Sequence, residues 1–139
     1  VSAVEKLAQN LFLAASTPAQ YAALAAFTPA AQAVFEERRR EFQARRDFLL
    51  PALRELGFSI PVTPDGAFYL YADCSRFSED SYGFALGLLE ETGVAITPGI
   101  DFGQYRPERH VRFAYTRAIP RLAEGVERLR VALRAKDRI

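Results

Sequence analysis

The chain begins with apolar residues at the spacing of a helix. Four of them lie three or four positions apart and share one helical face: Val1, Val4, Leu7 and Leu11. This stripe predicts a helix that ends near Ser16. Thr17 and Thr28 each precede a proline, and a hydroxyl residue before proline is typical of a helix N-cap, so both threonines are expected to cap a helix. A short helix to Phe27 and a longer one from Pro29 are therefore predicted.

The longest predicted helix extends from Pro29 to Leu56. Large apolar residues recur along it every seven positions: Phe35, Phe42, Leu49 and Leu56. Gly57 predicts the end of this helix, since glycine is the usual residue just beyond a helix C-terminus. Pro51 removes one helical hydrogen bond and crowds the preceding turn, so we expect a kink there.

The pattern changes from helical to extended after Gly57. Phe58–Val62 and Ala67–Ala72 read as strands, and the sequence between them contains Pro64-Asp65-Gly66. Proline presets one angle of a turn, and Gly66 is expected to accept a positive φ. This arrangement predicts a β-hairpin.

Two further strands and two helices are predicted in the rest of the chain. A helix begins at Ser78, with acidic residues at its positive end, and stops at Gly93. Short strands follow at Val94–Thr97 and His110–Thr116, separated by a loop. Pro120 opens the last helix, which carries leucine and valine along one side.

The predicted fold class is α+β, with N-terminal helices followed by a small sheet domain with flanking helices. The change of pattern near Gly57 divides the chain into a helical segment, residues 1–56, and a small α+β domain, residues 57–139. A chain that starts at Val1 and contains no methionine is expected to be a fragment or a processed product.

Composition narrows the classes of function. The chain has 18 Lys and Arg against 17 Asp and Glu, without the clustered basic excess that nucleic-acid binding requires. No apolar run approaches the roughly 18 residues of a membrane span, and no signal sequence opens the chain. We therefore expect a soluble cytoplasmic protein that binds neither nucleic acid nor membranes.

Few residues offer catalytic or metal chemistry. Cys74 is the one cysteine and His110 the one histidine, so an internal disulfide and a His/Cys metal cluster are both excluded. We expect Cys74 to be a small core residue and His110 a polar residue at a strand edge. Five arginines alternate with acidic residues on the long helix: Arg38, Arg39, Arg40, Arg45 and Arg46. They predict a solvated, ion-paired face, with phosphate binding as the weaker alternative.

Arg112 is the candidate binding residue. In the predicted strand, Val111, Phe113 and Tyr115 alternate onto one face and Arg112 onto the other. A guanidinium held by a strand suits two-point capture of a carboxylate, because its planar fork matches two oxygens. The pattern alone does not distinguish this role from that of an arginine on a solvated sheet face.

Several motifs together resemble one family. PDGAFYLYADCS, LLEETGVAITPGIDFG and HVRFAYTRA, with QNLFLAASTPAQYAAL and FEERRREFQARRDFLLPAL before them, are similar to the C-terminal portion of the pyridoxal-phosphate-dependent aminotransferases of fold type I, class I/II. The resemblance implies the linking helices and small domain of that fold. It also implies that Arg112, in the R-F-x-Y segment, binds the substrate α-carboxylate. The matches at Pro64–Tyr69 and Pro98–Gly103 are turns beside the cleft.

The chain also departs from the family pattern. The Schiff-base lysine of the family lies in a Ser-x-x-Lys segment, and neither Lys6 nor Lys136 has such neighbours. The chain therefore has no candidate catalytic or cofactor-binding residue of its own, and none for a metal. Pyridoxal 5'-phosphate would be bound by the complete enzyme only.

The resemblance predicts an aminotransferase segment that is inactive alone. In the complete enzyme an amino acid would pass its amino group to a 2-oxo acid, and the resemblance implies a homodimer. The alternative from another class is a freestanding small α+β module that binds amino acids or mediates an interaction. The sequence does not specify the substrate side chain.

Overall fold

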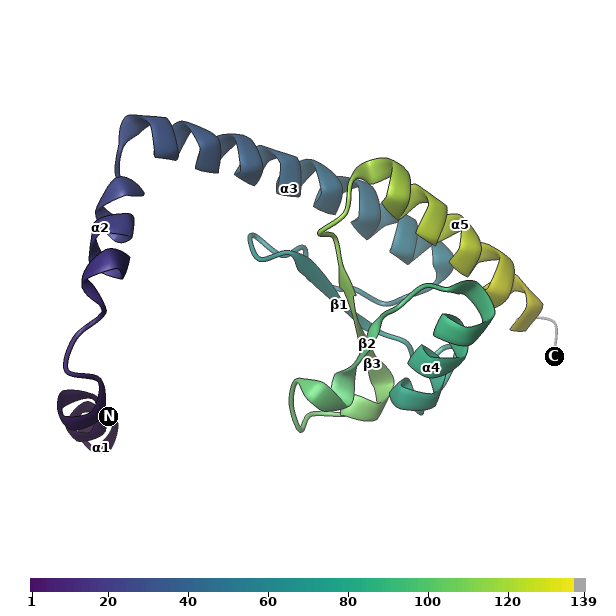
Figure 1. The fold of residues 1–139 in the computed structure, drawn as a ribbon. Coiled ribbons are helices and arrows are strands. Elements are labelled where there is room, and N and C mark those ends of the chain that lie inside the picture. Colours follow the sequence, from purple (N-terminus) through teal and green to yellow (C-terminus); the bar gives the residue numbers. More distant parts are fainter. Residues whose placement is uncertain (137–139) are drawn as a thin grey trace. The chain divides into compact units, whose positions relative to one another are not determined.

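The computed structural model describes residues 1–136 of the chain (Figure 1). The chain divides into two compact units, Val1–Arg40 and Glu41–Ile139. The first unit contains α1 (Ser2–Leu7), the π-helical turn η1 (Ala8–Phe12), α2 (Thr17–Ala25) and the beginning of α3 (Pro29–Leu56). The second unit contains the rest of α3, β1 (Tyr69–Asp73), α4 (Ser81–Thr92), β2 (Thr97–Pro98), the 3₁₀ turns η2 (Gly99–Asp101) and η3 (Pro107–Arg109), β3 (His110–Ala114) and α5 (Ile119–Lys136). The fold is α+β, as predicted.

The helices of the first unit match the sequence pattern in part. Thr28 caps α3, because its Oγ1 accepts a hydrogen bond at 3.3 Å from the backbone N–H three residues later. The same prediction is wrong at Thr17: Ser16 is the N-cap of α2, and no described side chain caps that helix. The first helical stretch ends at Phe12 rather than near Ser16, since Leu13 has a φ of 57° and leaves the helical conformation.

The long helix α3 continues through Pro51 and ends where the sequence predicts. Leu56 is its last residue, and Gly57 has a φ of 106°, which glycine adopts without steric cost. The chain then folds back on the helix, because the Phe58 N–H donates to the Leu53 carbonyl at 3.1 Å. This return brings the following segment over the C-terminal half of α3.

The second unit contains a three-stranded antiparallel sheet in the order β1-β3-β2, with β3 in the middle. The strand predicted over 94–97 is shorter and lies later in the chain, since β2 consists of Thr97 and Pro98 alone. The Val94 N–H donates instead to the Thr92 hydroxyl at 3.1 Å, so it is directed to the end of α4 rather than to a strand.

The hairpin predicted before β1 does not form. Within Phe58–Val62 only Ser59 pairs with β1, through two backbone hydrogen bonds to Asp73 at 3.1 and 2.9 Å. The Ile60 carbonyl accepts the guanidinium of Arg54 at 3.0 and 2.5 Å, and the residue after it is a proline without an N–H. Because Ser59 and Asp73 form a hydrogen-bonded antiparallel pair, the next residue that would bond to β1 is Pro61, which has no N–H to donate, so the pairing does not extend.

The turn before β1 is held by side chains from elsewhere in the unit. Its positive φ falls on Ala67, at 64°, and not on Gly66 as predicted. The Tyr115 hydroxyl lies 3.3 Å from the carbonyl oxygens of both residues, and Arg46 donates to the Pro64 carbonyl at 2.8 Å. These contacts stabilise a turn that local sequence does not specify.

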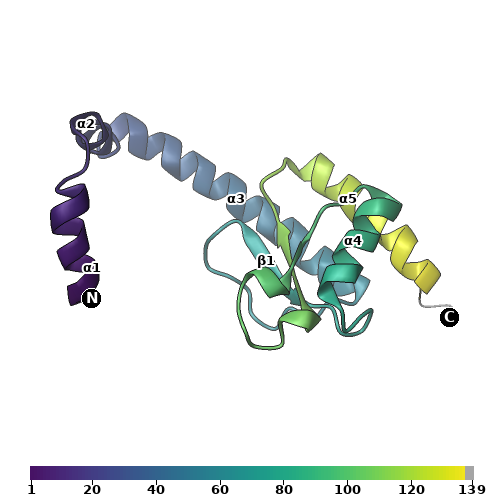
Figure 2. The same cartoon turned by 60° about the horizontal axis from the view of Figure 1, so that its bottom comes forward.

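One face of the sheet forms the core of the second unit. The strands contribute four residues that are at most 5% exposed: Leu70, Ala72, Val111 and Phe113. The helices cover them with Leu49, Leu50 and Leu53 of α3, Phe84 and Leu88 of α4, and Val126, Leu129 and Leu133 of α5. Figures 1 and 2 both show the C-terminal half of α3 running beside α5. All three helices therefore pack on the same face.

The helix α4 has its own end signals. It begins three residues later than predicted, because the Asp80 carboxylate, rather than Ser78, accepts hydrogen bonds at 3.1 and 3.0 Å from the Tyr82 and Gly83 N–H groups. Gly93 ends the helix with a φ of 69°, as the sequence predicts.

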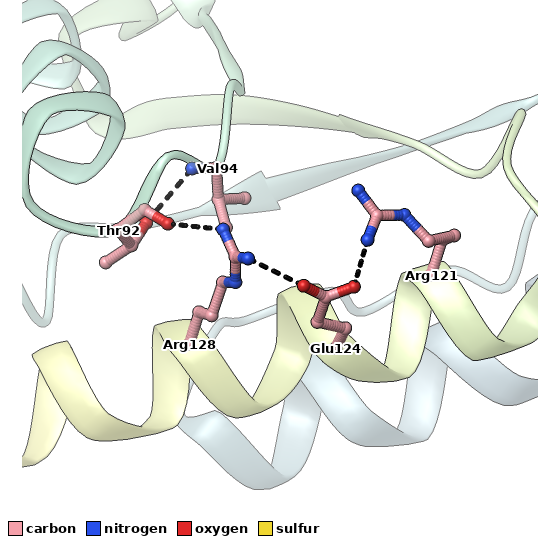
Figure 3. A network of polar contacts seen from close by, with 5 residues as sticks. All are labelled: Thr92, Val94, Arg121, Glu124 and Arg128. Carbon is pink, nitrogen blue, oxygen red and sulfur yellow. Dashed lines mark hydrogen bonds and ion pairs between the residues drawn. The ribbon is translucent and has the colours of Figure 1, made fainter.

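A polar network joins the end of α4 to α5 (Figure 3). Arg128 donates to the Thr92 carbonyl at 3.1 Å, which satisfies a carbonyl that the end of α4 leaves free. Glu124 accepts from Arg128 at 2.6 Å and also pairs with Arg121. The arginines here stabilise the packing of two helices.

Candidate functional site

Arg112 lies in the middle of the central strand, on the face of the sheet opposite the core. Tyr71 of β1 and Thr97 of β2 are its two cross-strand neighbours. Val111 and Phe113 on either side are 0% and 5% exposed, whereas Arg112 is half-buried. The predicted alternation around Arg112 is confirmed, and the core contacts of β3 do not involve it.

The guanidinium of Arg112 is in contact with three other segments. Its Nη2 donates to the Thr97 hydroxyl at 3.3 Å. Its Cζ lies 4.6 Å from the centre of the Phe102 ring and 5.5 Å from that of Tyr69, within the range of cation–π attraction. Nε is buried and has no hydrogen-bond partner among the described residues. The terminal nitrogens are thus the atoms that a ligand would meet.

A groove of about 470 Å³ opens beside the guanidinium. Arg112 is the lining residue that is always charged, and most of the others are aromatic or polar. The groove is lined by Tyr69, Tyr71, Phe102, Gly103, Gln104, Tyr105, His110 and Arg112. A concave site with apolar walls and few polar groups is typical of small-molecule binding. The arrangement can hold a carboxylate at one end and an apolar group along the rings.

The loop that carries Phe102 is packed against the sheet at Gly99. A Cβ on this glycine would lie 2.4 Å from the Pro107 carbonyl, 2.6 Å from that of His110 and 2.9 Å from the Tyr71 hydroxyl. Any side chain would therefore push the loop outward. The Pro98–Gly103 match is such a turn, and its glycine permits the close approach.

His110 lies at the border of the groove and, among the described residues, does not belong to a group of metal ligands. Its ring stacks on Tyr71 at 4.9 Å with an interplanar angle of 4°, and Nδ1 lies 2.9 Å from the Arg106 carbonyl. Tyr71 in turn meets Phe102 edge to face at 6.2 Å. Within the described part, no three His, Cys, Asp or Glu side chains form a group that could hold a metal ion.

The thiol next to this region is not a reactive group. Cys74 is fully buried, and burial together with the negative charge of Asp73 raises its pKa to about 11. Burial alone would raise the pKa of Asp73, but hydrogen bonds from Ser75 and the nearby charges of His110 and Arg109 hold it below its usual value. Cys74 therefore fills the core beside a charged aspartate.

The arginine-rich stretch of α3 forms ion pairs within the helix. Glu36 binds Arg39 and Arg40 at 2.7 and 2.9 Å, and these hydrogen bonds lower its pKa to about 2. Further along, Arg45 donates to the Thr116 carbonyl at 2.9 Å, and Arg46 holds the turn described above. The solvated, ion-paired face is confirmed at Arg39 and Arg40, whereas the side chains of Arg45 and Arg46 are only 11% and 17% exposed and have structural roles that the sequence pattern did not indicate.

The sequence model of the family "aminotransferase class I and II" matches residues 1–129, and the chain belongs to this family. Valine–pyruvate aminotransferase of Mycobacterium tuberculosis is 39% identical over 127 residues, which cover 91% of this chain and 33% of the relative. The (5-formylfuran-3-yl)methyl phosphate transaminase of Methanocaldococcus jannaschii is 36% identical over 130 residues, or 94% and 34% of the two chains.

Solved structures agree with this membership. An aminotransferase from Mycobacterium tuberculosis matches with a TM-score of 0.86 at 38% identity, covering 96% of this chain and 35% of that one. A putative aminotransferase from Silicibacter pomeroyi matches with a TM-score of 0.81 at 41% identity, covering 96% and 36%. The chain thus spans about a third of the length of its relatives, and a freestanding binding module is not favoured.

The family implies pyridoxal phosphate in the full enzyme, but the residues around Arg112 do not fit its Schiff base. None of the described residues that line the groove is a lysine. Lys6 belongs to the first unit, and the side chain of Lys136 lies outside the described residues.

Across the described part of the chain, no helix is long and apolar enough to cross a membrane.

Thr97, Phe102 and Tyr69 are site residues that sequence reasoning did not single out. Phe102 stood within a recognised turn motif, but nothing in that motif indicates that its ring lies over Arg112. Thr97 becomes a neighbour of Arg112 only through the register of β2 on β3. Only the residue-by-residue pairing of β2 with β3 identifies Thr97 as a neighbour of Arg112, and a single sequence does not contain that information.

Proposed function

We propose that this chain supplies the substrate α-carboxylate site, Arg112, of a pyridoxal-phosphate-dependent aminotransferase. The observation that carries the proposal is the position of its guanidinium, fixed in the central strand at the wall of a groove of about 470 Å³. A planar fork on a rigid base can hold both oxygens of a carboxylate with little loss of freedom on binding. Membership of the aminotransferase family supports the same role.

One arginine can serve both substrates of the reaction. An amino acid and a 2-oxo acid each carry a carboxylate on the carbon next to the reacting centre, so the same two-point contact orients either. Bound pyridoxal phosphate would supply the electron sink for proton removal, with its lysine provided by chain outside the 139 residues. The part of this segment is to bind the carboxylate and aim Cα.

We further propose the organisation that the sequence indicates for the complete enzyme. Residues 57–139 form its small domain, and residues 1–56 are helices that lead from the large domain. The enzyme is a homodimer, as the family resemblance implies, and cytoplasmic. The name of the valine–pyruvate aminotransferase supports an amino acid and a 2-oxo acid as substrates, and the different substrate in the name of the second relative means that no side chain is selected for this protein.

The test compares the full-length protein with the 139-residue chain, each with added pyridoxal phosphate. We expect amino-group transfer to a 2-oxo acid by the full-length protein only, since the short chain lacks the lysine segment. Borohydride reduction with mass mapping reports where the cofactor forms its bond. A stoichiometric adduct at Lys6 or Lys136 with turnover by the short chain would contradict the proposal, as would a full-length protein without transfer.

A further inference from the structure

The position of Arg112 in β3 fixes its backbone but does not by itself fix the orientation of its guanidinium. The side chain of arginine has several rotatable bonds, and ordering a long side chain costs conformational entropy. The backbone of Arg112 is held on both sides by the sheet, so the remaining question is what orients the terminal nitrogens. The neighbours of those nitrogens in this structure are few and specific.

Thr97 restrains the guanidinium from the β2 side. It is the cross-strand partner of Arg112, and its hydroxyl accepts the Nη2 hydrogen bond at 3.3 Å. The contact occupies one N–H of the fork and so limits rotation within the guanidinium plane. No other side-chain hydrogen bond of Arg112 occurs in the described part of the chain.

Phe102 restrains the plane of the guanidinium. Its ring centre lies 4.6 Å from Cζ, closer than the Tyr69 ring at 5.5 Å on the β1 side. Tyr71 supports Phe102 from its edge at 6.2 Å. The close packing at Gly99 prevents the loop from moving inward or taking a side chain at that point.

We infer that Thr97 and Phe102 are positioning residues, which hold Arg112 in the orientation that receives the substrate carboxylate. The inference rests on the proposed function of Arg112 and adds two residues to it. Thr97 sets the rotation of the fork, and Phe102 sets its tilt. Without them the charge stays in the groove, but the two nitrogens no longer face two oxygens together.

The experiment measures steady-state kinetics of the full-length holoenzyme with paired variants. Thr97→Val removes the acceptor at nearly constant volume, and Thr97→Ser keeps it. Phe102→Leu removes the aromatic face, and Phe102→Tyr keeps it. We expect the Val and Leu variants to lose about five- to tenfold in kcat/KM for amino acid and 2-oxo acid, mostly through KM, because a contact to a charged group is lost. The Ser and Tyr variants should stay within about twofold.

A second substrate separates positioning from general damage. The primary amine that corresponds to the amino acid without its carboxylate can react but cannot use Arg112. The ratio of kcat/KM for the amino acid to kcat/KM for this amine should therefore fall about five- to tenfold in the Val and Leu variants and stay near the parent value in the Ser and Tyr variants. Equal losses for amine and amino acid, or a Ser variant as poor as the Val variant, would overturn the inference.

An Arg112→Lys background distinguishes this inference from the proposed function. If both are right, Arg112→Lys lowers kcat/KM and Thr97→Val adds little in that background. If Arg112→Lys is impaired while Thr97→Val and Phe102→Leu are normal, the positioning role is overturned and the function of Arg112 stands. An unimpaired Arg112→Lys enzyme overturns both.

Discussion

The two faces of the sheet differ in what their side chains do. On one face Leu70, Val111 and Phe113 are at most 5% exposed and pack against three helices. On the other, Tyr69 and Tyr71 are 38% and 37% exposed and line a groove. Successive residues of one strand therefore face the core and the groove in turn, because side chains alternate along a strand.

The backbone of Arg112 is held in a fixed position although its side chain is not part of the core. Its two neighbours in β3 are buried and fix the strand, while its own side chain contributes to the groove. Substitutions on the two faces should accordingly have separable effects. The following predictions test that separation.

The largest effect is expected on the core face. Phe113 is 5% exposed and meets the Phe58 ring edge to face at 5.0 Å. Phe113→Ala should lower the free energy of unfolding by about 3–5 kcal/mol, because it removes a buried ring and leaves a cavity. Chemical denaturation of the full-length protein measures this loss.

Tyr69→Ala on the groove face is the matched control. It removes an aromatic ring from the same sheet, but one that is 38% exposed, so its cost should be smaller, at most about two thirds as large, and no closed cavity is left behind. Similar losses for both variants would mean that the groove face contributes to the core, and the comparison would fail.

A second prediction concerns the thiol at the end of β1. Because the pKa of Cys74 is raised to about 11, the thiol stays protonated at pH 8, where the reactive thiolate is about one part in a thousand. Labelling of native Cys74 should be at least about a hundredfold slower than that of a free cysteine and should quicken as pH rises toward 11. Mass mapping identifies the labelled site, and the denatured protein serves as the fast control. Rapid labelling of the native protein at pH 8 would show that this part of the core is open.

The sequence supports much of the fold but less of the site. Positive φ angles at Gly57 and Gly93 end two helices as predicted, since these are local choices of the backbone. The hairpin predicted before β1 is wrong because Pro61, two residues after the single bridge between Ser59 and Asp73, has no N–H with which to extend the pairing. The positive φ falls on Ala67 because Tyr115 and Arg46 hold that turn from outside.

The site shows the same division between local and distant information. The alternation around Arg112 is local, and it was predicted from five consecutive residues. The contacts with Thr97 and Phe102 depend on the register of β2 and on a loop that closes over the sheet. Neither is encoded in the spacing of residues near Arg112, so only the structure brings them together.

The central claim is that Arg112 binds the substrate carboxylate and is not needed for the core. Arg112→Lys in the full-length enzyme tests it most directly, because lysine keeps the charge and loses the two-point fork. Steady-state kinetics should show a loss in kcat/KM of roughly tenfold or more for amino acid and 2-oxo acid, equivalent to about 1.4 kcal/mol or more of transition-state binding. Thermal unfolding of the same variant should match the parent protein. Unchanged kcat/KM for both substrates would remove Arg112 from the site, and a drop in melting temperature that accounts for the lost activity would make its role structural.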